Sequence, residues 1–393
     1  MSRLLTAITP ALPDDGTAGA LAGRVWRPNC AGPSVVAIRD DGVFDISRHF
    51  ATMRDLAEAP DPAAALRAAS GGNLGALDVI LANTPSDHRD PARPWLLAPI
   101  DLQAIKAAGV TFANSMLERV IEERARGNSD AAAGLRAEVE RLIGDDLSTL
   151  KPGSEQAMAL KAALIKAGAW SQYLEVGIGP DAEIFTKAQP MAAIGTGMDA
   201  GVHPGSSWNN PEPEMVLVVN STGTIVGATL GNDVNLRDVE GRSALLLGKA
   251  KDNNASASVG PFVRFFDAGF GIDDVRNAVI SLTVAGEDNF RLEGASSMAK
   301  ISRDPEDLAG QMLNAHHRFP DGAVLYCGTM FAPVQDRGAP GQGFTHRTGD
   351  IVTIATPKLG RLVNRVRPTD QCEAWGFGAG ALMRNLAKRG LLG

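Results

Sequence analysis

The spacing of apolar residues changes twice along the chain. From residue 1 to about 100, short apolar runs such as 34–38 and 78–81 are separated by turn-forming Gly, Pro, Asn and Asp. This pattern predicts a small N-terminal α+β domain over residues 1–100, with one or two short helices. The segment Pro91–Pro94 is the expected connection out of it.

Between about 113 and 170 the apolar residues recur at helical spacing. Met116, Leu117, Val120 and Ile121 mark one helical face, and Gly127 is its expected end. Further helices are predicted near 131–143 and from 154 to 168. These segments form a helical lid or insert within a larger unit that spans residues 101–393.

From residue 175 onward the pattern is mostly that of β-strands. Two apolar runs, 215–219 and 224–230, flank Ser221-Thr222-Gly223, which is typical of a hairpin. A basic amphipathic helix is expected over 379–391. We therefore expect an α+β, mostly β fold.

Composition excludes several classes of protein. The chain has 393 residues, 44% of them hydrophobic, and a formal net charge of −7, which disfavours disorder and nucleic-acid binding. No apolar run is long enough to span a membrane, and the N-terminus does not resemble a secretory signal. Three widely spaced cysteines exclude a disulfide framework. We expect a cytoplasmic protein.

One group of acidic residues suggests metal chemistry. Glu212 and Glu214 are two residues apart at a strand start, so their carboxylates point to the same face. If the hairpin turns about Thr222-Gly223, paired residue numbers sum to 445, and Asp233 lies opposite Glu212. Three converging carboxylates repel one another by about 4 kcal/mol per pair at 4 Å and an effective dielectric of 20. Mg²⁺, or Mn²⁺ in its place, would remove that repulsion. The alternative is a solvated acidic strand start with an unrelated loop aspartate.

Other common site motifs do not fit. Gly195-Thr196-Gly197 is followed by His203-Pro204-Gly205 and not by a helix, so the context of a dinucleotide-binding loop is missing. Neither a phosphate-binding P-loop nor a serine-hydrolase elbow occurs in the sequence.

These residues resemble the fumarylacetoacetate hydrolase superfamily. The resemblance rests on Glu212-Pro213-Glu214, Gly231-Asn232-Asp233, Gly260-Pro261 and Gly328-Thr329, together with the 349–354 and 360–366 segments. It covers roughly residues 105–367. It implies a mixed β-roll catalytic domain in which Glu212, Glu214 and Asp233 bind the cation.

Within that superfamily, the sequence is more similar to the branch that dehydrates 2-keto-3-deoxy sugar acids. The matching segments include 108–112, 184–188, 208–214 and 231–241. The branch has a lysine nine residues before the Gly-Pro, which corresponds to Lys251 and not to Lys249. The chain departs from the branch at 242–244 and 247–249.

The lid indicates which reaction to expect. Hydrolases of the superfamily place a His three residues before a Glu, and here those positions are Ser115 and Glu118. Without the His, water loss is favoured over hydrolysis. We expect Lys251 to stabilise the developing negative charge or to act as a base. Glu118, or else Glu122 or Glu123, is expected to act as an acid. The alternative is that these glutamates form a solvated helix face. Predicted substrate-binding residues are Ser115, Lys187, Arg237 and Thr329.

The resemblance therefore implies a Mg²⁺-dependent dehydratase for a small 2-keto-3-deoxy acid, with five carbons favoured. An acylpyruvate hydrolase or an oxaloacetate decarboxylase is the alternative within the superfamily. A non-catalytic sugar-acid sensor is the alternative of another class. The resemblance also implies a homo-oligomer, a dimer or a tetramer, with neither nucleic acid nor membrane as a partner.

Overall fold

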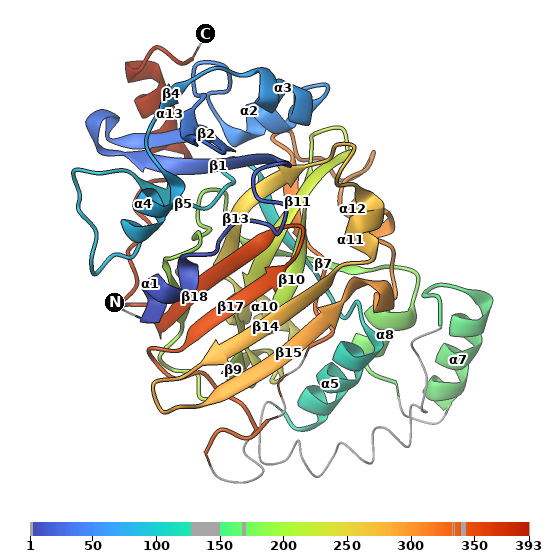
Figure 1. Cartoon of the computed structure of the whole chain (residues 1–393). Coiled ribbons are helices and arrows are strands. Elements are labelled where there is room, and N and C mark those ends of the chain that lie inside the picture. Colours follow the sequence, from blue (N-terminus) through green and yellow to red (C-terminus); the bar gives the residue numbers. More distant parts are fainter. Residues whose placement is uncertain are drawn as a thin grey trace.

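The computed structural model describes residues 3–126, 150–166, 170–331, 333, 335–338 and 343–392. Within these residues the fold is a strand-rich α+β fold built around two large sheets (Figure 1). Most of the helices labelled in Figure 1 lie around the edges of the sheets. None of the described helices is long and apolar enough to cross a bilayer.

The larger sheet has eleven strands in the described part of the chain. Its order is β4-β3-β2-β1-β13-β11-β10-β16-β6-β7, and β5 pairs with β1. Its strands are β1 (Ala20–Arg27), β2 (Gly32–Arg39), β3 (Gly42–Asp45), β4 (Gly72–Asn73), β5 (Trp95–Leu97), β6 (Ala104–Gly109), β7 (Glu183–Ala188), β10 (Pro213–Val219), β11 (Ile225–Asp233), β13 (Ala257–Phe265) and β16 (Ala323–Tyr326).

The second sheet packs one face against this larger sheet. Its order is β15-β14-β17-β18-β8. Alternate residues of β14, such as Leu282, are buried in a core shared with Leu217 and Leu230 of the larger sheet. Its strands are β8 (Asp199–Val202), β14 (Val279–Ala285), β15 (Arg291–Ser297), β17 (Ile351–Thr356) and β18 (Gly360–Pro368); a separate pair is formed by β9 (Asn209–Asn210) and β12 (Asn235–Leu236).

Helices α5, α7 and α8 share a core of their own beside the sheets, at the lower right of Figure 1. Met116 and Val120 of α5 pack there with Leu174 of α8. The described helices are α1 (Arg3–Ile8), α2 (Met53–Ala57), α3 (Pro62–Ala68), α4 (Leu77–Ala82), α5 (Ala113–Arg124), α7 (Glu155–Lys166), α8 (Gln172–Ile178), α9 (Arg237–Glu240), α10 (Leu247–Lys251), α11 (Ile272–Arg276), α12 (Pro305–Met312) and α13 (Ala379–Lys388), with 3₁₀ turns at Pro28–Cys30, Ala244–Leu246 and Met298–Lys300.

The predicted hairpin and its register are confirmed. Strands β10 and β11 pair with Pro213 opposite Asn232 and Glu214 opposite Gly231, and both pairs sum to 445. The turn is stabilised by Asn220, whose side-chain oxygen accepts hydrogen bonds from the N–H groups of Thr222 and Thr224. Gly223 has φ +91°, which a glycine adopts without strain.

The helical predictions are confirmed in part. Helices α5, α7 and α13 lie where the periodicity indicated, whereas the helix expected near 131–143 falls outside the described residues. The N-terminal region has more helix than predicted, because α1 to α4 all lie before residue 100 and residues 78–81 belong to α4. Short capped helices explain the error: Thr52 caps α2 and Asp61 caps α3.

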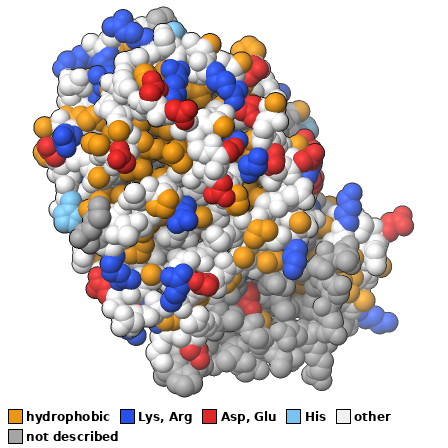
Figure 2. Space-filling view, in the orientation of Figure 1, with side chains coloured by type: hydrophobic (Ala, Val, Ile, Leu, Met, Phe, Trp, Pro, Cys, Tyr) orange, Lys and Arg blue, Asp and Glu red, His pale blue; other side chains and the backbone are white. Residues whose placement is uncertain are grey.

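Strands from the N-terminal region extend the larger sheet, since β1 pairs with β13. The division of the chain into domains at residue 100 remains a prediction. On the face shown in Figure 2, acidic and basic side chains are interspersed with apolar ones.

Candidate active site

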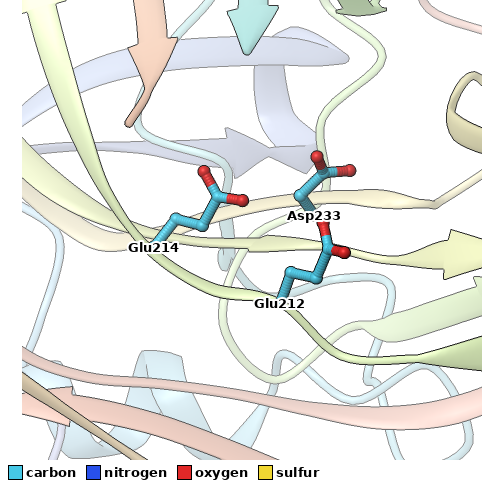
Figure 3. Close-up of side chains that lie close together, drawn as sticks. All are labelled: Glu212, Glu214 and Asp233. Carbon is cyan, nitrogen blue, oxygen red and sulfur yellow. The ribbon is translucent and has the colours of Figure 1, made fainter. Parts of the chain in front are cut away.

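Three buried carboxylates converge at the open end of hairpin β10–β11 (Figure 3). Glu212 directly precedes β10, Glu214 is its second residue, and Asp233 ends β11. The backbone N–H of Asp233 donates to the carbonyl of Glu212 at 3.1 Å, so the predicted pairing holds to the end of the strand. One oxygen from each carboxylate lies within 4.8 Å of the others. The geometry is that of a candidate metal site.

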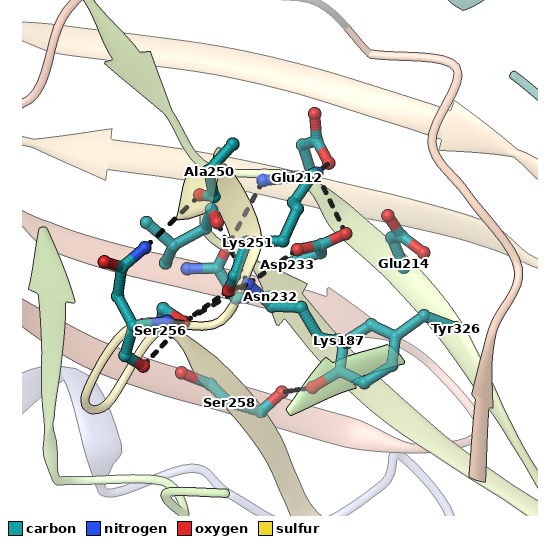
Figure 4. A network of polar contacts seen from close by, with 12 residues as sticks. Lys187, Glu212, Glu214, Asn232, Asp233, Ala250, Lys251, Ser256, Ser258 and Tyr326 are labelled. Atoms are coloured by element: carbon teal, nitrogen blue, oxygen red, sulfur yellow. Dashed lines mark hydrogen bonds and ion pairs between the residues drawn. The ribbon is translucent and has the colours of Figure 1, made fainter. Parts of the chain in front are cut away.

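Two lysines partly compensate this charge (Figure 4). The Lys251 ammonium lies 2.5 Å from Glu212 Oε2 and 3.0 Å from Asp233 Oδ2, and the Lys187 ammonium lies 2.8 Å from Asp233 Oδ1. Burial acts to raise the pKa of Asp233, but the two ammonium groups outweigh it and hold this pKa below its usual value. Burial acts to lower the pKa of Lys251, but Asp233 and Glu212 raise it above the usual range.

Glu214 is less well compensated. The backbone N–H of Gly328 donates to its Oε2 at 2.6 Å. Burial, followed by the charges of Asp233 and Glu212, raises the pKa of Glu214 well above its usual value. Of the three carboxyl groups, Glu214 therefore gains most from a cation placed among them.

Arg119 of α5 is a member of the site that the sequence analysis missed. Its guanidinium lies 2.6 Å from Glu212 Oε1 and 2.9 Å from Glu240 Oε2. No local signal singles it out, because Glu118 and Arg119 are adjacent charged residues of the same helix.

Glu183 was also missed. It begins β7 opposite Gly109 of β6, and a Cβ at position 109 would lie 1.9 Å from Glu183 Oε2. The glycine therefore makes room for this carboxyl group. Burial and the charge of Glu240 raise the pKa of Glu183 to about 7, which suits a group that exchanges protons near neutral pH.

These side chains enclose a cavity of about 20 Å³, lined by Glu212, Glu214, Asp233, Lys251, Arg119, Glu183, Glu240 and Thr329 among others. With Lys187 included, five carboxyl groups face three cationic side chains, which leaves an acidic excess that a divalent cation would neutralise. Carboxylate oxygens are also the donors that Mg²⁺ prefers. The residues present therefore fit a hard divalent cation.

Comparison with known proteins places this site in a family. Residues 179–367 match the model of the fumarylacetoacetate hydrolase C-terminal domain. This part of the chain is a fumarylacetoacetate hydrolase domain. It contains all three clustered carboxylates, Lys187, Lys251 and Glu183.

Two curated relatives extend the comparison. A 2-dehydro-3-deoxy-D-arabinonate dehydratase from Saccharolobus solfataricus is 31% identical over 47% of this chain and 58% of its own length. A probable 2-keto-3-deoxyxylonate dehydratase from Haloferax volcanii is 31% identical over 49% of this chain and 63% of its own length. The match thus spans less than two thirds of either relative.

Solved structures confirm the fold. A 2-keto-3-deoxy-D-arabinonate dehydratase complexed with magnesium and 2,5-dioxopentanoate superimposes with a TM-score of 0.61 at 21% identity. The superposition covers 88% of this chain and 99% of that one. The strand-rich α+β fold expected for a fumarylacetoacetate hydrolase domain is therefore observed.

The structure brings some of the predicted site residues together and separates others. Thr329 lines the cavity, whereas Lys187 is fully buried behind Asp233 and is not among the described lining residues. Lys249 is exposed, whereas Lys251 lies in the cluster. The count of nine residues back from Gly260-Pro261, which favoured Lys251 over Lys249, therefore agrees with the geometry.

Glu118 and Arg237 pair with each other. Arg237 Nη2 donates to Glu118 Oε2 at 3.2 Å, and the guanidinium lies over the ring of Trp208 at 4.3 Å. Neither residue is among the described residues that line the cavity. Ser115 and Glu122 lie in α5, but their side chains lie outside what the structure describes.

Proposed function

We propose that this protein is a Mg²⁺-dependent dehydratase of a 2-keto-3-deoxy sugar acid. The favoured substrate has five carbons, as in 2-keto-3-deoxy-D-xylonate or D-arabinonate, and the product is then 2-oxoglutarate semialdehyde. The observation that carries this proposal is the buried cluster of Glu212, Glu214 and Asp233 with Lys251 beside it. The names of the two 31% identical relatives support the choice of reaction.

Glu212, Glu214 and Asp233 would hold Mg²⁺. When bound, the ion supplies Lewis-acid polarisation of the substrate's 2-oxo group, which makes the C3 proton easier to remove. Lys187 holds Asp233 in place from the buried side, with its ammonium also donating to the carbonyl of Val234 at 3.1 Å. Lys187 thus acts as a positioning residue for a metal ligand.

Proton transfer needs two groups, one that removes the C3 proton and one that protonates the leaving C4 hydroxyl. Water loss leaves a C3=C4 double bond, and tautomerisation, in which a proton leaves C5 and one is added at C3, gives the C5 enol and then the C5 aldehyde. Glu183 suits one of these steps because its pKa of about 7 allows both protonation states near neutral pH. Lys251 supplies a positive charge beside the reacting atoms. Arg119 and Thr329 line the same cavity and would bind the substrate's carboxylate and hydroxyl oxygens.

Glu118 and Arg237 then act through helix α5. Their ion pair joins α5 to α9, and Arg119, the next residue along α5, reaches both Glu212 and Glu240. A five-carbon acid is larger than a cavity of about 20 Å³, so the site has to widen when substrate binds, and a shift of α5 would carry Arg119 with it. Ser115 and Glu122 remain predicted contributors from the same helix.

One assay tests the proposal. Purified protein is incubated with Mg²⁺ and 2-keto-3-deoxy-pentonate, and an aldehyde dehydrogenase reports the semialdehyde as it forms. Dehydration releases water and no carbon fragment, whereas an acylpyruvate hydrolase releases a carboxylic acid and an oxaloacetate decarboxylase releases CO₂. Ligand binding without turnover would favour the sensor. Turnover of acylpyruvate or oxaloacetate in preference to the sugar acid would overturn the proposal.

A further inference from the structure

A second and much larger cavity lies away from the carboxylate cluster. Its volume is about 420 Å³, within the range of small-molecule sites. It is lined by residues of β1, β5, 191–194, 198–199, 254–255 and 373–377, and its aromatic lining residues are Trp26, Trp95, Trp375 and Phe377.

The aromatic walls offer flat apolar surfaces. Trp26 and Trp95 stack with ring centroids 5.7 Å apart and planes at 22°, and Phe377 meets Trp26 edge-on at 5.1 Å. Trp375 remains 48% exposed, which is unusual for the largest apolar side chain. Arg89 already lies over the ring of Trp95 at 4.6 Å, so a planar ring placed in the cavity would stack on the exposed ring of Trp375.

The charged groups of the lining balance one another. Two are basic and two are acidic, and Arg89 donates to both carboxylate oxygens of Glu373 at 2.6 and 3.0 Å. Asp199 accepts from Arg365 at 2.7 Å, and the guanidinium of buried Arg24 lies 3.7 Å from Asp101. Because these charges are compensated, the cavity favours a neutral ligand.

One wall of the cavity leads to the carboxylate cluster. Asn254 and Ala255 line the cavity, and the Asn254 amide donates to the carbonyl of Thr369 at 3.0 Å. The next residue is Ser256, whose hydroxyl donates to the carbonyl of Lys251 at 2.7 Å. A ligand pressed against this loop therefore acts on the backbone that positions Lys251.

We propose that this cavity is a second binding site, for a small neutral molecule with a planar aromatic ring, and that its occupation is transmitted to Lys251 through the 252–256 loop. This site is separate from the proposed dehydration, and its test does not depend on turnover.

Benzamide serves as the probe, because it is neutral and planar and carries one polar group. Cyclohexanecarboxamide is the matched control without an aromatic ring, and D-xylose represents a neutral sugar. Isothermal titration of the full chain should give a dissociation constant on the order of 1 mM for benzamide, as expected for so small a ligand. The other two compounds should bind at least about tenfold more weakly.

Two variants locate the binding. Trp375→Ala should weaken benzamide binding at least about tenfold, whereas Trp170→Ala, which removes an aromatic ring from another part of the chain, should not change it. Benzamide should also slow amide hydrogen exchange in residues 253–256 and leave the 220–224 turn unchanged. This exchange measurement reports the coupling to the loop directly.

Several results would overturn the proposal. These are no detectable benzamide binding, equal binding of cyclohexanecarboxamide, tighter binding of xylose, or benzamide binding that survives Trp375→Ala. Unchanged exchange in 253–256 would refute transmission to Lys251. If sedimentation shows that Trp375→Ala dissociates an oligomer, the cavity is covered by a second copy and is not a ligand site.

Discussion

Hairpin β10–β11 and helix α5 both contribute charged side chains to the carboxylate cluster, but they position them differently. The hairpin places Glu212, Glu214 and Asp233 through backbone pairing, whose register continues to the end of the strand. Helix α5 packs its apolar face on α8, and its polar face meets the cluster through the ion pairs of Arg119. Backbone hydrogen bonds survive the substitution of a side chain, whereas a side-chain ion pair does not.

This difference suggests that the metal-binding half of the site is preorganised and that the α5 half adjusts to substrate. Single substitutions in the hairpin should remove a ligand without moving its neighbours. Single substitutions in α5 should alter how that helix sits against the site.

The largest effect is expected from Glu212→Gln and Glu214→Gln, which should each lower activity at least about 100-fold by weakening Mg²⁺ binding. In chelator the two variants should differ in thermal unfolding. Glu214→Gln removes a repelled carboxylate and keeps an oxygen for the Gly328 N–H, so its melting temperature should rise. Glu212→Gln removes one of the two carboxylates that face each of Arg119 and Lys251, so its melting temperature should fall.

Glu293→Gln, on an exposed part of β15, is the control for both measurements. Equal shifts of the melting temperature in the two cluster variants would contradict the charge distribution described for the site. Full activity in excess chelator would contradict the need for a metal.

The next effect concerns the two neighbouring lysines. Lys251→Met should lower kcat by about 10²–10³, because a fixed charge beside the reacting atoms is lost. Lys249→Met makes the same substitution on an exposed side chain two residues away and should leave kcat unchanged. Steady-state kinetics of both variants decides, and equal losses would show that Lys251 has no special role.

Much of the hairpin could be predicted from the sequence. The turn residues, the apolar runs and the alternation of side chains determine which carboxylates meet, and only local information is needed for this. The same reasoning underestimated the number of helices before residue 100, because helices as short as Met53–Ala57 show little periodicity.

The α5 half of the site could not be predicted in the same way. The sequence places Glu118 and Arg119 next to each other on a helix, but which one reaches the cluster depends on how the helix rotates against α8 and α9. The place of Glu183 in the site could not be predicted from the sequence for a related reason. Its raised pKa arises from burial and from Glu240, which is 57 positions further along the chain.

A smaller effect is expected when the two glutamates are compared directly. Glu183→Gln should lower kcat by about 10², the lower end of the usual loss when a positioned acid or base is removed. Glu118→Gln can still accept a hydrogen bond from Arg237, so its loss should stay within about tenfold and should affect KM as well as kcat. The reverse ranking would restore Glu118 as the proton-transfer group, as the sequence alone indicated.

The smallest effect is a pH dependence of stability. The pKa of Glu183 is raised from the ordinary 4.5 to about 7 in the folded chain, so between these pH values the folded state binds more protons than the unfolded state. The free energy of unfolding contributed by this group must therefore fall as the pH rises from about 4.5 to 7. Melting temperatures are measured in chelator, because Mg²⁺ binding improves as carboxyl groups lose protons and would mask this trend.

The Glu183→Gln variant has no proton to lose at this position. Between pH 5 and pH 7 its melting temperature should therefore fall less than the melting temperature of the unmodified chain. Glu214 contributes to both proteins and cancels in the comparison. Parallel curves would show that Glu183 has an ordinary pKa and is not the group that exchanges protons near neutral pH.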